Sequence, residues 1–176
     1  VRVVTHNPDR PIDPALITAR VQHAIALRKR LFDFDKTQSL REEIYESVLD
    51  SARMANRAGL KVVVDMHLFQ AGSNRSIGMG QVMDDPALFD AYVEAVRTMA
   101  GTLAQEDPTM VALEVMNEPI VDCEDGEKRW PEQLKRLFAA ARASATRLSL
   151  VLPGACWGSA SALAAIDPKD IPDDNI

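Results

Sequence analysis

GLKVVVDMH, residues 59–67, joins the end of a helix to a buried strand. Gly59 lacks a Cβ atom, so it suits the left-handed conformation in which many helices end. The β-branched run Val62–Val64 favours a strand, and an unbroken apolar run is typical of a parallel strand that is covered on both faces. The stretch therefore predicts a helix-to-strand step of an α/β protein.

Helices and strands alternate on both sides of this stretch. Asp85-Pro86 has the pattern of a helix start, with Asp as the N-cap and Pro in the first turn, and apolar residues then recur at helical spacing. The predicted strands cover residues 1–5, 60–67, 110–116 and 148–152, and the predicted helices cover residues 14–30, 39–58, 86–103, 130–147 and 160–165. This order predicts parallel strands joined by helical crossovers.

The positions of the polar residues favour a barrel over an open sheet. Polar or aromatic residues lie at or just past the carboxyl ends of three predicted strands: Asp65 and His67, Asn117 and Glu118, and Trp157. Barrel active sites are assembled at these ends. No Gly-rich dinucleotide-binding turn follows the first strand, and no P-loop motif occurs. We therefore expect the α/β class, as a (β/α)8 TIM barrel.

Composition excludes several classes of protein. The chain has 176 residues, 47% of them hydrophobic and 26% charged, which is the balance of a globular domain and not of a disordered chain. It contains no apolar run long enough to span a membrane. Its net charge is −6 and it has no Lys/Arg cluster, so we expect no nucleic-acid partner.

The cysteines and acidic residues offer little sign of a metal or redox site. Cys123 and Cys156 are too few for a disulfide framework, and we expect both to be unpaired small hydrophobes, with a bridge as the less favoured alternative. No zinc-type His/Cys spacing is present. The acidic cluster at 122–127 could attract a cation but is more typical of a solvated loop. We expect neither a metal nor a cofactor.

LEVMNEP, residues 113–119, carries the sharpest chemical signal. Pro119 cannot donate a ladder hydrogen bond, so the strand must stop before it and leave Asn117 and Glu118 at the lip of the sheet. A carboxyl group beside an amide suits glycoside cleavage, in which the acid protonates the leaving oxygen and the amide binds a sugar hydroxyl. The alternative is a Glu that caps a nearby loop. The strand-end position favours the catalytic role.

This segment resembles the Asn-Glu-Pro signature of glycoside hydrolase family 5, retaining glycosidases with a (β/α)8 barrel. The resemblance implies that Glu118 ends strand 4 as the general acid/base, with Asn117 holding the 2-hydroxyl of the sugar. Strand 3 of the family is similar to residues 62–67, and its final His, here His67, would line the subsite around the scissile bond. Strand 2 is similar to residues 1–3, where Arg2 would support the nucleophile.

The resemblance extends to the end of strand 5, which is similar to residues 150–154 followed by Trp157. Trp157 would then be a platform on which a sugar stacks, although a loop Trp packed on the barrel rim is an equal alternative. His67 has the alternative of a satisfied core histidine. Trp130, beside a helix start, is better explained as a structural staple. His6 is better explained as an exposed loop residue.

The chain departs from the family in one important respect. A retaining mechanism needs two carboxyl groups ~5 Å apart, and the family's nucleophilic Glu ends strand 7, which has no counterpart here. Glu114 lies ~13 Å from Glu118 along the strand, so it is too distant, and Asp65 is better suited to orienting neighbours. We therefore expect a β-glucan hydrolase, cellulase- or endoglucanase-like, whose nucleophile lies outside this chain.

The resemblance also implies the extent of the domain. A complete barrel takes about 250 residues, so we expect residues 1–176 to form a partial catalytic domain, strands 2–5 with their helices, cut through strands 2 and 6. The expected partner is a β-glucan or oligosaccharide, and exposed half-barrel edges favour self-association. The alternatives are an inert half-barrel that at most binds carbohydrate, and an unrelated β/α protein. Export is slightly favoured, because members of the family are often exported.

Overall fold

The computed structural model describes residues 38–68, 78–124, 128–174 and 176. Its strands form a parallel sheet in the order β1-β2-β3, with β1 at Val62–Asp65, β2 at Val111–Glu114 and β3 at Ser149–Val151. The helices are α2 Gln38–Arg57, α3 Met79–Asp84, α4 Pro86–Leu103, α5 Trp130–Ser144, α6 Ala155–Gly158 and α7 Ala160–Ala164, followed by the 3-10 helix η1 Pro168–Asp170.

Each strand is followed by helix before the next parallel strand begins. Val62 pairs with Val111 and Asp65 with Glu114, while Leu113 pairs with Leu150. Every predicted strand in the described ranges is present, shorter by one or two residues at each end. The helix α3 lies between the predicted strand 60–67 and the predicted helix 86–103, where the sequence pattern predicts no element. The predicted strand 1–5, with Arg2 and His6, lies outside the described residues, as does the predicted helix 14–30.

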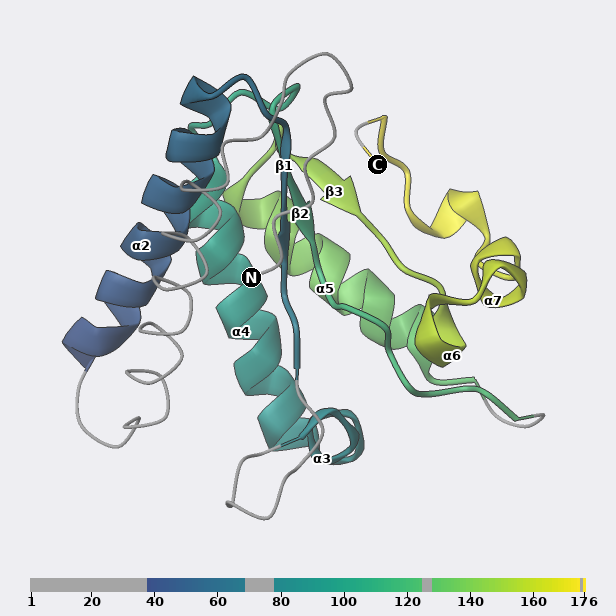
Figure 1. Cartoon of the computed structure of the whole chain (residues 1–176). Coiled ribbons are helices and arrows are strands. Elements are labelled where there is room, and N and C mark those ends of the chain that lie inside the picture. Colours follow the sequence, from purple (N-terminus) through teal and green to yellow (C-terminus); the bar gives the residue numbers. More distant parts are fainter. Residues whose placement is uncertain (1–37, 69–77, 125–127, 175) are drawn as a thin grey trace.

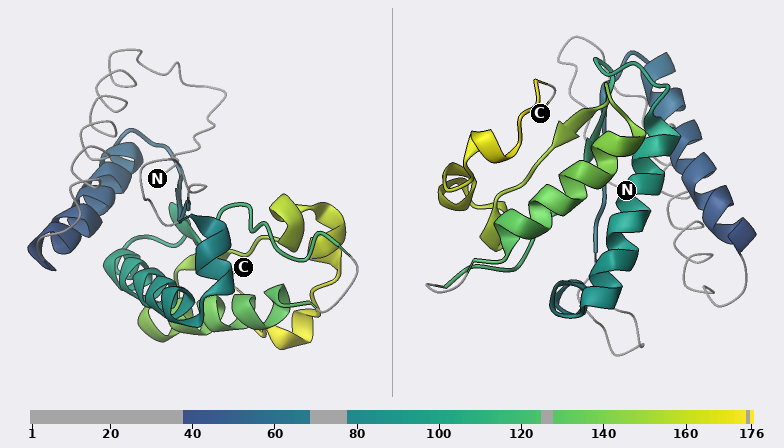
Figure 2. Two further views of the ribbon diagram at one scale, coloured as in Figure 1. Left: turned by 90° about the horizontal axis from the view of Figure 1, so that it is seen from below. Right: turned by 180° about the vertical axis from the view of Figure 1, so that it is seen from behind.

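The long helices pack beside one another against one face of the sheet (Figures 1 and 2). α4 lies between α2 and α5, and its contact with α5 is the most extensive between two helices. Fully buried apolar side chains from α4, α5 and β2 form the centre of this layer: Val96, Ala100, Leu103, Leu134, Leu137, Val111 and Leu113. The apolar periodicity seen in the sequence therefore corresponds to a real core.

Two helix ends confirm the predicted chemistry of their termini. The Asp85 carboxylate accepts hydrogen bonds from the backbone N–H groups of Ala87 (2.8 Å) and Leu88 (3.2 Å), so it caps α4. Gly59 has a φ of 76°, and the N–H of Leu60 donates to the carbonyl of Ala55 at 3.1 Å, which closes α2 in a Schellman motif. In the described ranges, no helix combines the length and apolarity that a bilayer crossing needs.

The expectation that the two cysteines are unpaired is wrong, because Cys123 and Cys156 form a disulfide. They are 33 residues apart in sequence, but Cys123 lies in the loop after β2, and Cys156 lies in α6, a single turn after the neighbouring strand β3. Within α6, Cys156 and Trp157 have non-helical backbone angles. The carboxyl ends of parallel strands meet at one edge of the sheet, which brings the two Cα atoms to 4.7 Å. Spacing along the chain carries no sign of this meeting.

Candidate active site

The candidate site lies where β1 and β2 end side by side. Backbone pairing continues past both strands. The N–H of Met66 donates to the backbone carbonyl of Glu114, and the N–H of Asn117 donates to the backbone carbonyl of Met66, each at 3.1 Å. His67 follows Met66 directly, and Glu118 follows Asn117. The pairing therefore carries the predicted histidine and the Asn-Glu pair to the same edge of the sheet.

A small pocket of about 100 Å³ opens at this edge. Four of the five predicted site residues line it, and the fifth, Arg2, lies outside the described residues. Their apolar neighbours come from the segments that follow β1 and β2 and from the start of α3. The lining residues are His67, Leu68, Met79, Asn117, Glu118, Ile120 and Trp157.

Glu118 presents its side chain to solvent at the pocket, whereas Asn117 is only 9% exposed. The backbone of Glu118 has a φ of 45°, which L-residues rarely adopt. The buried Pro119 follows at once and restricts the chain further. Strained residues of this kind gather at functional sites, where the surrounding structure holds them in place. The strain at Glu118 therefore agrees with a functional role for this position.

His67 is paired with a buried carboxylate. Its Nδ1 lies 3.4 Å from Oδ2 of Asp65, and the Asp65 side chain is 4% exposed whereas that of His67 is 35% exposed. A carboxylate can only accept, so Asp65 favours the proton on Nδ1 and fixes the orientation of the ring. This geometry fits the expectation that Asp65 orients a neighbour. An imidazole exposed to this extent is not the satisfied core histidine of the alternative.

Tyr92, on α4, braces the ends of both strands from the helix side. Its hydroxyl lies 3.0 Å from the carbonyl oxygen of Met66 and 2.9 Å from that of Val115, so one proton is shared between two acceptors. Burial raises the pKa of Tyr92 well above 10.0, and the nearby Asp65 and Glu114 carboxylates raise this pKa further. The sequence shows Tyr92 only as one apolar position of a helix, so its bracing role could not be found there.

Trp157 forms the wall of the pocket contributed by α6, the short turn after β3. Its side chain is 52% exposed, and its backbone N–H donates to the carbonyl of Pro119 at 2.9 Å. Its φ is 63°, between Cys156 at 48° and Gly158 at 70°. An indole exposed to this extent beside a pocket is available to a ligand, which favours the stacking platform over a Trp packed on the rim.

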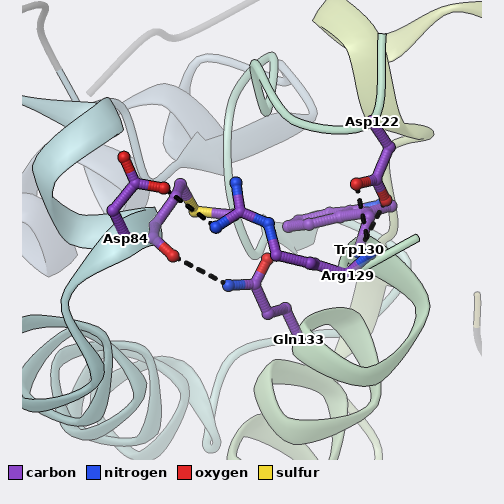
Figure 3. Close-up of polar contacts among 6 residues, drawn as sticks. Asp84, Asp122, Arg129, Trp130 and Gln133 are labelled. Atoms are coloured by element: carbon purple, nitrogen blue, oxygen red, sulfur yellow. Dashed lines mark hydrogen bonds and ion pairs between the residues drawn. The ribbon is translucent and has the colours of Figure 1, made fainter. Parts of the chain in front are cut away.

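The acidic loop after Glu118 holds the start of α5 (Figure 3). The Asp122 carboxylate accepts from the backbone N–H of Arg129 at 3.1 Å and of Trp130 at 2.7 Å, and Arg129 in turn pairs with Asp84 at 2.8 Å. Trp130 is 1% exposed and its indole N–H donates to Pro153 at 2.9 Å, which confirms a structural staple. Across the described part of the chain, no acidic, His or Cys group is arranged to hold a metal ion.

A parallel β/α arrangement with a polar pocket at the carboxyl ends of its strands is the architecture of a (β/α) barrel, here a partial one. Residues 19–176 match the model of the family described as cellulase (glycosyl hydrolase family 5). The chain belongs to this family, which confirms the resemblance seen in the sequence. Among curated protein sequences, none matches the chain significantly.

Solved structures of glycosidases share the fold. Thermotoga maritima Cel5A in complex with mannotriose has a TM-score of 0.57 and 20% identity, covering 71% of this chain and 37% of its own. An endoglucanase has a TM-score of 0.60 and 19% identity, covering 77% and 39%. Endo-glycoceramidase II from Rhodococcus sp. has a TM-score of 0.53 and 17% identity, covering 65% and 36%. The chain thus spans well under half the length of these relatives.

Proposed function

We propose that this chain carries the acid/base side of the active site of a β-glucan hydrolase that retains the configuration of the cleaved sugar. The observation that carries the proposal is the pocket itself, in which an exposed Glu118 carboxyl group lies with the Asn117 amide, the His67 imidazole and the Trp157 indole. An acid, an amide and an aromatic face are the groups that glycoside cleavage uses.

Glu118 would protonate the oxygen of the leaving sugar and then, as a carboxylate, take a proton from the attacking water. Asn117, nearly buried and therefore held in one orientation, would bind the 2-hydroxyl. His67, oriented by Asp65, would contact the sugar at the scissile bond. Trp157 would stack on the apolar face of a pyranose.

The nucleophile of this mechanism would come from outside residues 1–176, with Arg2 supporting it. In the described part of the pocket, Glu118 is the carboxylate among the lining residues, and a retaining site needs a second one ~5 Å away. The partial coverage of the solved relatives is in keeping with this arrangement. The intact reading frame should therefore place a strand-end Glu about two to three βα units after Ile176.

The solved relatives support both the substrate class and retention. Thermotoga maritima Cel5A is described in complexes with mannotriose and with cellobiose. Endo-glycoceramidase II from Rhodococcus sp. is described as a lactosyl-enzyme intermediate. A covalent glycosyl-enzyme is the intermediate of a retaining mechanism, so a fold relative of this chain follows the proposed route.

The test compares two leaving groups in the intact protein. Glu118→Gln should lower kcat on cellotetraose by about 10²–10⁴-fold, because the leaving sugar needs a proton. On 2,4-dinitrophenyl β-cellobioside, whose leaving group departs without a proton, the formation of the glycosyl-enzyme should be little affected. Glu124→Gln, an exposed glutamate that does not line the pocket, is the matched control. Unchanged hydrolysis of cellotetraose by Glu118→Gln would remove Glu118 from the mechanism.

A second candidate function is carbohydrate binding without hydrolysis. The observation in its favour is the single carboxylate in the described part of the pocket. One assay distinguishes the two candidates. If the protein only binds carbohydrate, calorimetry will detect binding of cellotetraose by the intact protein, and no reducing sugar will be released.

We further propose that the 176 residues expressed alone associate with one another. Val151, on β3, is 38% exposed, and apolar side chains at a sheet surface favour contact with a second chain. Light scattering should therefore give a mass above that of a monomer, and a monomer that melts cooperatively would contradict the proposal.

A further inference from the structure

We propose that the Cys123–Cys156 disulfide is a positioning cross-link that holds Trp157 as a wall of the pocket beside Glu118. The inference deepens the proposed function and rests on it. The disulfide joins the loop that follows Glu118 to the turn that carries Trp157. Neither cysteine lines the pocket, so any effect on sugar must act through a neighbour.

The cross-link is aligned with two backbone hydrogen bonds between the same segments. The N–H of Cys156 donates to the carbonyl of Val121, and the N–H of Trp157 donates to the carbonyl of Pro119, both at 2.9 Å. Pro119 directly follows Glu118. These contacts therefore set the backbone of Trp157 relative to the proposed acid/base residue.

Both segments, the loop after Glu118 and the turn that carries Trp157, contain residues with unfavourable backbone angles. The non-glycine residues with positive φ in the described ranges all lie here: Glu118, Asp122, Cys156 and Trp157. L-residues disfavour this conformation, because Cβ crowds the carbonyl oxygen. A turn with two such residues in succession relaxes unless other contacts hold it. The indole of Trp157, half exposed, has little packing of its own to supply that hold.

The loop with Cys123 is the fixed partner of this pair. Asp122, the residue before Cys123, accepts two backbone hydrogen bonds from the start of α5 (Figure 3). Helix α5 packs in turn along α4 in the core. The disulfide thus ties the strained turn of Trp157 to a support that is anchored in the body of the domain.

The test is a double-mutant cycle in the intact protein. Cys123→Ser should raise KM for cellotetraose by about two- to ten-fold, the value of one aromatic contact, with kcat little changed. In a Trp157→Ala background the same Cys123→Ser change should have no further effect on KM, because its target is gone. Leu148→Ala, which removes a buried side chain at the other end of β3, is the control for lost stability and should leave KM unchanged.

Equal effects of Cys123→Ser with and without Trp157, or no effect on KM in the presence of Trp157, would overturn the inference. So would a peptide map of the unreduced protein without the Cys123–Cys156 cross-link.

A fluorescence measurement separates failure of this inference from failure of the proposed function. The anisotropy decay of Trp157, taken as the difference between the protein and its Trp157→Phe variant, needs no sugar. Cys123→Ser should add a sub-nanosecond component to this decay, and an unchanged decay would overturn the inference. If the intact protein neither binds nor cleaves cellotetraose, the proposed function fails, and the decay still decides whether the disulfide holds the indole.

Discussion

The two walls of the pocket are built in different ways. The wall with His67 and Asn117 continues the pairing of β1 and β2, and Tyr92 braces it from the core. The wall with Trp157 lies beyond β3, in a turn of unfavourable backbone angles that a disulfide ties to the neighbouring loop. Under the proposed function, the residues that act at the scissile bond come from strand ends, whereas the stacking surface depends on a cross-link outside the sheet.

The largest expected effect concerns the turn after β3. A Cβ atom on Gly154 would lie 2.5 Å from the backbone N of Leu163 and 2.7 Å from the carbonyl oxygen of Ser159. Gly154→Ala should therefore displace the turn and lower the free energy of unfolding by about 3 kcal/mol, the upper end for overpacking. Urea unfolding measures this loss.

Gly101→Ala is the matched control. Gly101 lies inside α4, and a Cβ atom added there would lie 3.7 Å from the Cβ atom of Ser144 on α5, an ordinary contact distance. This variant should be neutral or more stable by up to about 1 kcal/mol. If Gly154→Ala behaves like this control, the turn is looser than the contacts indicate and the contrast between the two walls fails.

The next effect concerns the support of the cross-linked wall. Asp122→Ala removes the acceptor for two N–H groups at the start of α5, and should cost about 1–2 kcal/mol of unfolding free energy, as the loss of a helix cap does. Asp122→Asn, which keeps one carbonyl acceptor, should lose less. Because the loop also carries Cys123, the first variant should raise KM more than it lowers kcat. A variant that lowers kcat and leaves KM unchanged would contradict the assignment of Asp122 to the support of Trp157.

A smaller effect is expected at the brace of the strand-built wall. Tyr92→Phe leaves two carbonyl groups without their shared donor and should cost about 1 kcal/mol of unfolding free energy. The effect on the enzyme should fall on kcat, since His67 and Asn117 follow these carbonyls. Thr102→Val is the control, because that exposed hydroxyl donates to the carbonyl of Thr98 within α4, away from the strand ends. Equal losses of unfolding free energy and of kcat in both variants would show that the Tyr92 hydroxyl does not brace the strand ends.

The last effect is seen only in alkaline solution. Burial, and then the Asp65 and Glu114 carboxylates, raise the pKa of Tyr92 above 10.0 in the folded chain. The unfolded chain therefore loses this proton first, so the stability due to neutral Tyr92 is complete below about pH 10 and is lost as the pH rises toward the folded pKa. Unfolding free energy should fall by up to about 1.4 kcal/mol per pH unit there. Tyr92→Phe should lack this slope, and an identical slope in the variant would exclude Tyr92 as its source.

The sequence predicts what depends on local pattern and on the rule that parallel strands end at one edge. The strand order, the caps at Asp85 and Gly59, and the meeting of His67, Asn117, Glu118 and Trp157 all follow from these two sources. Each of them needs only the residue, its neighbours and the class of fold.

What the sequence misses are contacts between distant side chains. The disulfide, the Tyr92 brace and the Asp122 cap depend on the exact twist of the sheet and on the shape of loops. An apolar period shows that Tyr92 is buried, but not which carbonyls its hydroxyl meets. Likewise, the sequence shows that the loop is acidic, but not that Asp122 accepts from two backbone N–H groups seven and eight residues further along the chain.

The most direct test of the two-wall account compares Glu118→Gln with Trp157→Ala in steady-state hydrolysis of cellotetraose by the intact protein. The account predicts that Glu118→Gln lowers kcat by about 10²–10⁴-fold and hardly changes KM. It predicts that Trp157→Ala raises KM by about two- to ten-fold and hardly changes kcat. Losses of both variants in the same parameter, or the reverse assignment, would contradict it.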